Sequence, residues 1–164
     1  MTDGRVKLNI LLGIANGMAQ LHECNVTHGD LKPQNVLITD EYHAKIADFG
    51  LATLRTAAYM APELLSTSVI ANEKTDMYSF GVLMNEVLHE EEPYQQNLRQ
   101  FVGKGPFTAV LFAKEGNRPQ IRDKIVTPEL KQSIQKCWSQ QDDDRPTFAE
   151  VATSPSKCGI PHAC

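Results

Sequence analysis

Hydrophobic residues recur at helical spacing in two long segments of the chain. In the first, apolar side chains fall three and four residues apart between Leu8 and Ala19, which predicts a helix from Val6 to about Glu23 with a wide apolar face. Gly13 and Gly17 lower its helix propensity but allow a neighbour to pack closely. The second segment, Lys74 to His89, is apolar on more than one side, so we expect a deeply buried helix.

Shorter patterns fill the rest of the chain. The runs "NVLI" and "HAKIA" have strand character and flank the polar stretch "TDEY", which predicts a β-hairpin. The segment Glu90 to Pro106 is polar and rich in Gly and Pro, so we expect it to be mainly loop. Further helical segments are predicted at Pro62–Leu65, Phe107–Glu115, Pro128–Ser139 and from Thr147 onward. The fold class is therefore mainly α, with one small hairpin.

Composition and charge limit the number of domains, the classes of binding partner and the cellular compartment that we expect. The 164 residues suffice for one domain with a real core, or for part of a larger one. The net charge is −4 and the basic residues are scattered, which argues against nucleic acid and anionic membrane as partners. No apolar run is long enough to span a bilayer, and the stretch "MTDGRVKLN" lacks the apolar core of a signal peptide. These features predict an intracellular, cytoplasmic protein whose cysteines are free thiols.

The stretch "THGDLKPQNVLI" concentrates polar chemistry on a short loop. Pro33 pushes Lys32 into an extended conformation, so the loop cannot coil into a regular helix. It presents a carboxylate on Asp30, an ammonium on Lys32 and an amide on Asn35 just before the predicted hairpin. Asp and Asn are also common turn formers, which is the structural alternative for these residues.

The expected hairpin register adds a second carboxylate. If Leu37 pairs with Ile46, Asn35 lies directly opposite Asp48, and side chains so placed are about 5 Å apart. One carboxylate and one amide oxygen suit Mg²⁺, which completes its shell with water and phosphate oxygens. The set fits phosphoryl transfer, in which Asp30 orients or deprotonates an attacking hydroxyl and Lys32 adds positive charge.

Several motifs carry a resemblance to a known family. In order, "HGDLKPQN", "DFG" and "YMAPE" resemble the catalytic loop, the metal-binding loop and the end of the activation segment of protein kinases. The stretches "TDMYSFGVLMNE" and "CWSQQDDDRPTF" are similar to later parts of the kinase large lobe, in the style of the tyrosine-kinase-like group. Lys32 after Leu31 is similar to serine/threonine kinases. The resemblance covers about Val6 to Val151, which implies a large-lobe domain over residues 1–152 and a disordered tail over 153–164.

The resemblance implies a function and a site. The fold would be the α+β kinase-like fold, with a helical large lobe, a hairpin that carries the metal site, and no N-terminal β-rich lobe. The activity would be transfer of the ATP γ-phosphate to a Ser or Thr of a protein substrate, with Mg²⁺. The implied roles are catalytic for Asp30 and Lys32, nucleotide-binding for Lys32, Asn35, Leu37 and Asp48, and metal-binding for Asn35 and Asp48.

One departure from the family leaves an alternative open. The sequence contains no Gly-rich loop before a strand and no strand lysine to hold the α- and β-phosphates. A catalytically inactive, pseudokinase-like interaction module is therefore the competing hypothesis. If the protein is instead an active kinase, a partner or a longer gene product would supply the small lobe.

The same resemblance predicts roles for residues outside the proposed ligand set. Gly29 stands where most members have an Arg that receives the phosphate of the activation segment, so this catalytic loop would not be switched that way. His28 would be a packing residue that touches Phe49 rather than an acid or base. Asp76 would be a buried anchor of the catalytic-loop backbone. Glu63 and Arg145 would form a buried ion pair.

Overall fold

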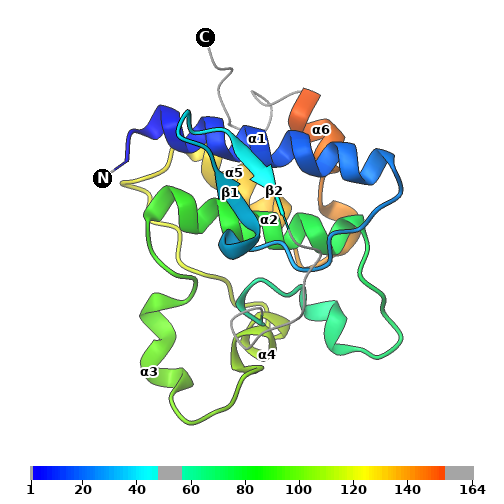
Figure 1. The fold of residues 1–164 in the computed structure, drawn as a ribbon. Helices are drawn as coiled ribbons and strands as arrows, with labels where there is room; N and C mark the ends of the chain where they lie inside the picture. The colour runs from blue at the N-terminus through cyan, green and yellow to red at the C-terminus, as the bar shows by residue number, and fades with distance from the viewer. Residues whose placement is uncertain (1, 48–56, 154–164) are drawn as a thin grey trace.

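The computed structural model describes residues 2–47 and 57–153. Over these residues the chain is mostly helical, and the one sheet has two strands (Figure 1). The α-helices are α1 (Gly4–Glu23), α2 (Glu73–His89), α3 (Leu98–Phe101), α4 (Thr108–Lys114), α5 (Pro128–Cys137) and α6 (Phe148–Thr153). The strands are β1 (Val36–Ile38) and β2 (Ala44–Ile46), and the 3₁₀ turns are η1 (Pro33–Asn35), η3 (Pro62–Leu65), η4 (Gln95–Asn97) and η5 (Asp142–Asp144). The predicted fold class is confirmed, and a β-rich lobe is not among the described residues.

The ends of the two long helices follow from their capping residues. The side chain of Asp3 accepts a hydrogen bond from the Arg5 N–H, so α1 begins at Gly4, two residues before the predicted start. Asn72 and Thr75 form a reciprocal capping box that starts α2. Glu90 takes a left-handed conformation, with φ 54°, and ends it.

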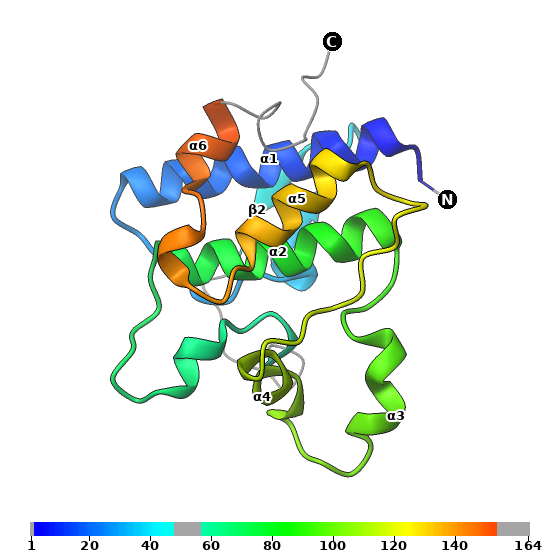
Figure 2. The ribbon, with the colours of Figure 1, turned by 180° about the vertical axis from the view of Figure 1, so that it is seen from behind.

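Helix α2 forms the centre of the core, as its pattern predicted. Its side chains Met77, Phe80 and Met84 are fully buried. Helix α1 runs alongside α2 in both views, α5 packs on α2 on the face of the molecule opposite the hairpin, and α6 packs on α1 (Figures 1 and 2). No described helix is both long and apolar enough to cross a membrane.

The hairpin packs on α1 at Gly13 and Gly17. A Cβ added to Gly13 would lie 3.2 Å from Cβ of Ala44, and one added to Gly17 would lie 3.1 Å from the side chain of Ile46. Larger residues at either position would push β2 away, which confirms the predicted close packing of a neighbour at these glycines. The packing fixes the hairpin beside the loop that precedes it.

The predicted register of the hairpin is wrong by one residue. Val36 pairs with Ile46 and Leu37 with Lys45, so Asn35 lies opposite Ala47, whose N–H donates to the Asn35 carbonyl at 2.9 Å. The turn decides this, because the Thr39 N–H donates to the His43 carbonyl and closes the ladder there. A slip of one residue moves side chains to the opposite face of the strand, so the residue that pairs with Asn35 is Ala47 and not the predicted one.

The segment predicted to be mainly loop contains a helical element that the sequence pattern missed. After α2 the chain forms η4 and α3, held by an aromatic cluster of Tyr94, Phe101 and Phe112. Ring centroids within the cluster are 5.5–5.9 Å apart. The predictions for the activation segment around Asp48 to Thr56 and for the tail beyond Thr153 lie outside the described residues.

Candidate active site

The loop between α1 and η1 is attached to the core by one carboxylate. Asp76, on α2, is 1% exposed. Its Oδ2 accepts the backbone N–H of His28 and its Oδ1 accepts that of Gly29, both at 2.8 Å. Nε2 of His22 lies 2.9 Å from the same Oδ2. The expected role of Asp76 as the buried anchor of this loop is thus confirmed.

His28 serves the structure of the loop. Its side chain is buried, and its Nδ1 accepts the backbone N–H of Asp30 at 3.2 Å. Nε2 must then carry the proton, and it donates to the carbonyl of Ala47 at 3.3 Å. The imidazole thereby ties the loop to the end of the hairpin, as a structural residue would. Its expected contact with Phe49 lies outside the described residues.

Asp30, Lys32 and Asn35 converge at the end of this loop. Lys32 Nζ lies 2.6 Å from Asp30 Oδ2, and both side chains are 6% exposed. The amide nitrogen of Asn35 donates to the Asp30 carbonyl at 2.7 Å and lies 3.4 Å from Oδ2. The donor side of the amide therefore faces Asp30, and its acceptor side is the one that a cation would need.

The second oxygen of Asp30 is a hydrogen-bond acceptor that the described residues leave unused. Oδ1 is buried and makes no hydrogen bond with any described residue. A buried polar atom without a partner is costly, and a buried ion pair adds little stability. An acceptor held in this way can take a hydrogen bond, and then a proton, from a hydroxyl group brought beside it.

The remaining predicted nucleotide and metal ligands are only partly visible. Leu37, on β1, is 58% exposed, so its side chain is accessible to a ligand. Asp48 lies outside the described residues. Among the described residues there is no cluster of three or more His, Cys, Asp or Glu side chains that could hold a metal ion. Asn35 is thus the one predicted metal ligand whose position can be described, and an amide oxygen is a suitable ligand for Mg²⁺.

The backbone conformation at position 29 explains why this residue is glycine. Its φ is +79°, in the left-handed region that other residues rarely adopt. A Cβ there would meet only the Ala71 side chain at 4.0 Å, so the space is open and the backbone alone disfavours a side chain. The positive φ at this position therefore favours Gly over the Arg that most family members have there.

The predicted Glu63–Arg145 pair is confirmed. The guanidinium of Arg145 donates to both carboxylate oxygens of Glu63, at 2.5 and 3.0 Å, and its side chain is fully buried. The same guanidinium also donates to the carbonyls of Ser139 and Lys74. The pair ties η3, at the end of the activation segment, to the loop before α6.

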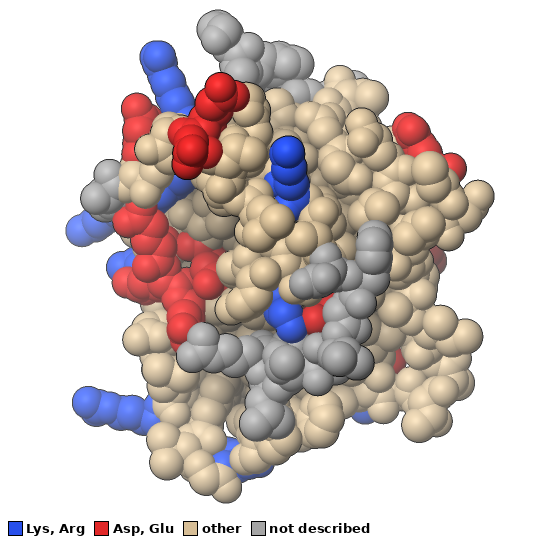
Figure 3. Space-filling model, in the orientation of Figure 1, with Lys and Arg blue, Asp and Glu red and all other residues tan. Residues whose placement is uncertain are grey.

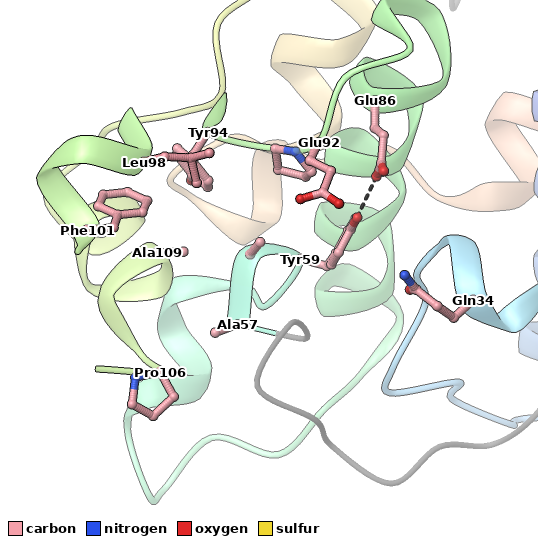
Figure 4. Close-up of a pocket in the computed structure, with 12 residues that line it drawn as sticks. Gln34, Ala57, Tyr59, Glu86, Glu92, Tyr94, Leu98, Phe101, Pro106 and Ala109 are labelled. Atoms are coloured by element: carbon pink, nitrogen blue, oxygen red, sulfur yellow. Dashed lines mark hydrogen bonds between the residues drawn. The ribbon is translucent and has the colours of Figure 1, made fainter. Parts of the chain in front are cut away.

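A pocket beside the catalytic loop was missed by sequence reasoning. It has a volume of about 170 Å³, and Gln34, Tyr59, Glu86, Glu92 and Tyr94 are among its lining residues (Figure 4). The Tyr59 hydroxyl donates to the Glu86 carboxylate at 2.5 Å, and burial raises the pKa of that carboxyl above its usual 4.5. The detectable signal was an acidic residue, Glu86, within an otherwise buried helix.

Comparisons with known proteins agree with these features. The profile of the protein kinase domain family matches residues 1–156. The chain is 37% identical to a probable serine/threonine-protein kinase of Dictyostelium discoideum, over 91% of the chain and 11% of that protein. It is 35% identical to the serine/threonine-protein kinase VIK of Arabidopsis thaliana, over 88% of the chain and 36% of that protein. It is 32% identical to the human receptor-interacting serine/threonine-protein kinase 1, over 89% of the chain and 25% of that protein.

The chain thus spans between about a tenth and about a third of the length of these relatives. The family profile, however, covers nearly all of the chain, including the loop of Asp30 and the pair of Glu63 and Arg145. The chain belongs to the protein kinase family, and the relatives that it matches are serine/threonine-protein kinases.

Proposed function

We propose that this chain is the part of a serine/threonine-protein kinase that carries the catalytic loop. In this proposal the γ-phosphate of ATP is transferred to the hydroxyl of a Ser or Thr in a protein substrate, with Mg²⁺. The observation that carries the proposal is the buried Asp30, whose Oδ2 is held by Lys32 while its Oδ1 has no partner among the described residues.

Asp30 would act as the general base. Its Oδ1 accepts the hydrogen bond of the incoming hydroxyl, orients the oxygen for attack and takes the proton as the bond to phosphorus forms. The 2.6 Å contact from Lys32 fixes the carboxylate and keeps a positive charge close to the transferred group. Asp76 holds the backbone of the loop in place through His28 and Gly29.

Nucleotide and metal would be held by neighbouring residues. Mg-ATP supplies the transferable phosphoryl group and the charge of the metal. Asn35 and Asp48 would bind the metal, Lys32 would meet phosphate oxygens, and the exposed Leu37 would contact the nucleotide. The amide orientation of Asn35 supports its assignment, and the assignment of Asp48 rests on the "DFG" resemblance.

The alternative is a non-catalytic interaction module. The observation that favours it is the exposure of two apolar side chains of β1, Leu37 at 58% and Ile38 at 45%, which lie on opposite faces of the hairpin. Such side chains are also suited to contact another protein. The two proposals differ in whether Asp30 is needed for turnover or only for structure.

The test uses a longer protein that also carries a Gly-rich loop and a strand lysine, from the upstream coding sequence or by fusion. Asp30→Asn should lower the phosphorylation rate of a Ser/Thr peptide at least 100-fold and leave the calorimetric affinity for Mg-ATP within about threefold. Asp40→Asn, on the exposed hairpin turn, is the matched control and should leave both unchanged. Equal loss in both variants, or no activity in the parent protein, would favour the interaction module.

A further inference from the structure

A groove lies between α3 and α4, away from the catalytic loop. It has a volume of about 510 Å³. The rings of Phe101 and Phe112, with centroids 5.5 Å apart, line it together with the side chain of Leu111. Leu111 is 52% exposed. The groove is thus an apolar surface that the described chain leaves uncovered.

Large apolar side chains also project beside the groove. Val102, which follows α3, is 79% exposed, and Phe107, which caps α4, is 55% exposed. Leu98, on α3, is 45% exposed, but it lines the pocket beside the catalytic loop and not this groove. In the space-filling view, the surface over α3 is mostly tan with blue side chains, and acidic side chains gather higher on the same face (Figure 3). The surface therefore combines a hollow with apolar projections, which together can bury a partner's surface.

The two charged residues that line the groove have opposite signs and lie at opposite ends of α4. Lys104 is on the turn that enters the helix, and Glu115 is its C-cap. Both side chains are exposed, and neither forms an ion pair with a described residue. Seven residues of helix separate these ends by about 10 Å. Lys114, the last residue of α4, is not among the residues that line the groove.

We propose that this groove is the contact surface for a second copy of the same chain. A two-fold axis across the middle of α4 would exchange the ends of the helix, so that Lys104 of each copy meets Glu115 of the other. An interface of this kind must be self-complementary, and a groove that is positive at one end and negative at the other meets that condition. The projecting Phe107 of one copy would fill the apolar hollow of the other.

The size of the surface sets the expected strength. Only a short helix and its flanking turns take part, so the interface falls in the small, weak class. We expect a monomer–dimer equilibrium in the micromolar to millimolar range. A peptide from a different protein could bind in the same apolar hollow. Its binding would not depend on pairing between Lys104 of one copy and Glu115 of another.

Sedimentation equilibrium of the purified chain at low salt tests the proposal. Lys104→Glu and Glu115→Lys should each weaken self-association at least tenfold, because each places like charges opposite one another. The two single variants mixed in equal amounts should form a heterodimer, since every contact then joins opposite charges. The double variant should self-associate within about threefold of the unmodified chain. Leu111→Ser should also weaken the dimer at least tenfold.

Two controls separate this surface from the hairpin face. Lys45→Glu, a charge reversal of an exposed lysine on β2, and Leu37→Ser, on β1, should leave the dimer unchanged. Circular dichroism should show the same helical content in all variants, because every substituted side chain is exposed. A chain that stays monomeric at millimolar concentration overturns the proposal, as does a dimer lost in Leu37→Ser or a mixture of single variants that does not associate. Binding of a foreign peptide without self-association would likewise overturn it.

Discussion

The carboxylate of Asp76 holds the backbone N–H of Gly29 at 2.8 Å, although the two residues are 47 positions apart in the chain. The same carboxylate accepts the N–H of His28, so one buried side chain of α2 sets the conformation of the loop that carries Asp30. Because Gly29 has a positive φ, this loop depends both on a long-range hydrogen bond and on a local residue type.

Asp76→Asn should destabilise the protein. The amide that replaces one carboxylate oxygen cannot accept an N–H, so at least one buried donor among His28, Gly29 and His22 loses its partner. The expected loss in the free energy of unfolding is about 1–3 kcal/mol, measured by urea denaturation. Asp143→Asn, on an exposed turn, should change stability by less than about 0.5 kcal/mol. Equal stability of the two variants would show that Asp76 does not anchor the loop.

Gly29→Ala should cost about 1 kcal/mol of the free energy of unfolding. The added Cβ has room, since its nearest neighbour is 4.0 Å away, so the cost comes from the backbone alone. Gly29→Asn should cost less, because Asn tolerates the left-handed region better than Ala does. Gly4→Ala serves as the control, because that Cβ meets nothing within 4 Å at an ordinary φ. A neutral Gly29→Ala would mean that the positive φ is not maintained in solution.

Regulation by activation-segment phosphate should be weak. Without an Arg at position 29, a phosphate on Thr53 or Thr56 has no obvious receptor. Tyr59 is 5% exposed and its hydroxyl is bonded to Glu86, so it is a poor acceptor site in the folded protein. Phosphatase treatment of an active longer protein should therefore change its rate by less than about threefold. A rate that collapses and then returns on rephosphorylation at Thr53 would contradict this interpretation of Gly29.

Glu63→Gln should be strongly destabilising, because it leaves the buried guanidinium of Arg145 without its carboxylate. Removal of one partner of a buried pair costs about 3–5 kcal/mol, and the bonds of Arg145 to the Ser139 and Lys74 carbonyls place the expected value at the lower end. Asp123→Asn breaks the exposed pair with Lys131 and should cost less than about 1 kcal/mol. Thermal and urea unfolding of both variants would compare the two pairs directly.

His89 should make stability depend on pH. Its Nδ1–H donates to the Asn85 carbonyl and its Nε2 accepts the Arg122 N–H at 2.9 Å, so the neutral imidazole fits the structure. Burial, with a smaller contribution from Arg122, lowers the pKa of His89 below 6.5. Just below pH 6.5 the unfolded chain therefore binds more protons, and the free energy of unfolding should fall as the pH drops through that range.

The measurement is the urea midpoint at pH 7.5 and at pH 5.5. His89→Gln should reduce the loss of stability between these two values, whereas His43→Gln, on the exposed hairpin turn, should leave it unchanged. Glu86 contributes the opposite slope above pH 4.5, because burial raises its pKa. Only the difference between His89→Gln and the unmodified chain therefore isolates His89. An identical loss in both would mean that His89 does not contribute.

Local patterns in the sequence were enough to identify several parts of the fold. The periodicity of α1 and α2 predicted both helices, with starts that differ from the observed ones by two residues and one residue. Alternating and turn residues predicted the hairpin, and Gly13 and Gly17 indicated where it would pack. The order of "HGDLKPQN", "DFG" and "YMAPE" indicated the family. These features depend on neighbours in the chain, which a single sequence records directly.

The tertiary structure alone decided the features that depend on distant residues. The register of β1 against β2 was set by the Thr39–His43 turn and not by the apolar pattern, which fits more than one pairing. Helix α3 forms in a segment without helical periodicity because Phe101 packs on Phe112, which lies outside that segment. The pocket at Glu86 and the groove that joins Lys104 and Glu115 arise where separate elements meet. Such sites depend on contacts among many residues that are far apart in the chain. A short stretch of sequence does not record those contacts.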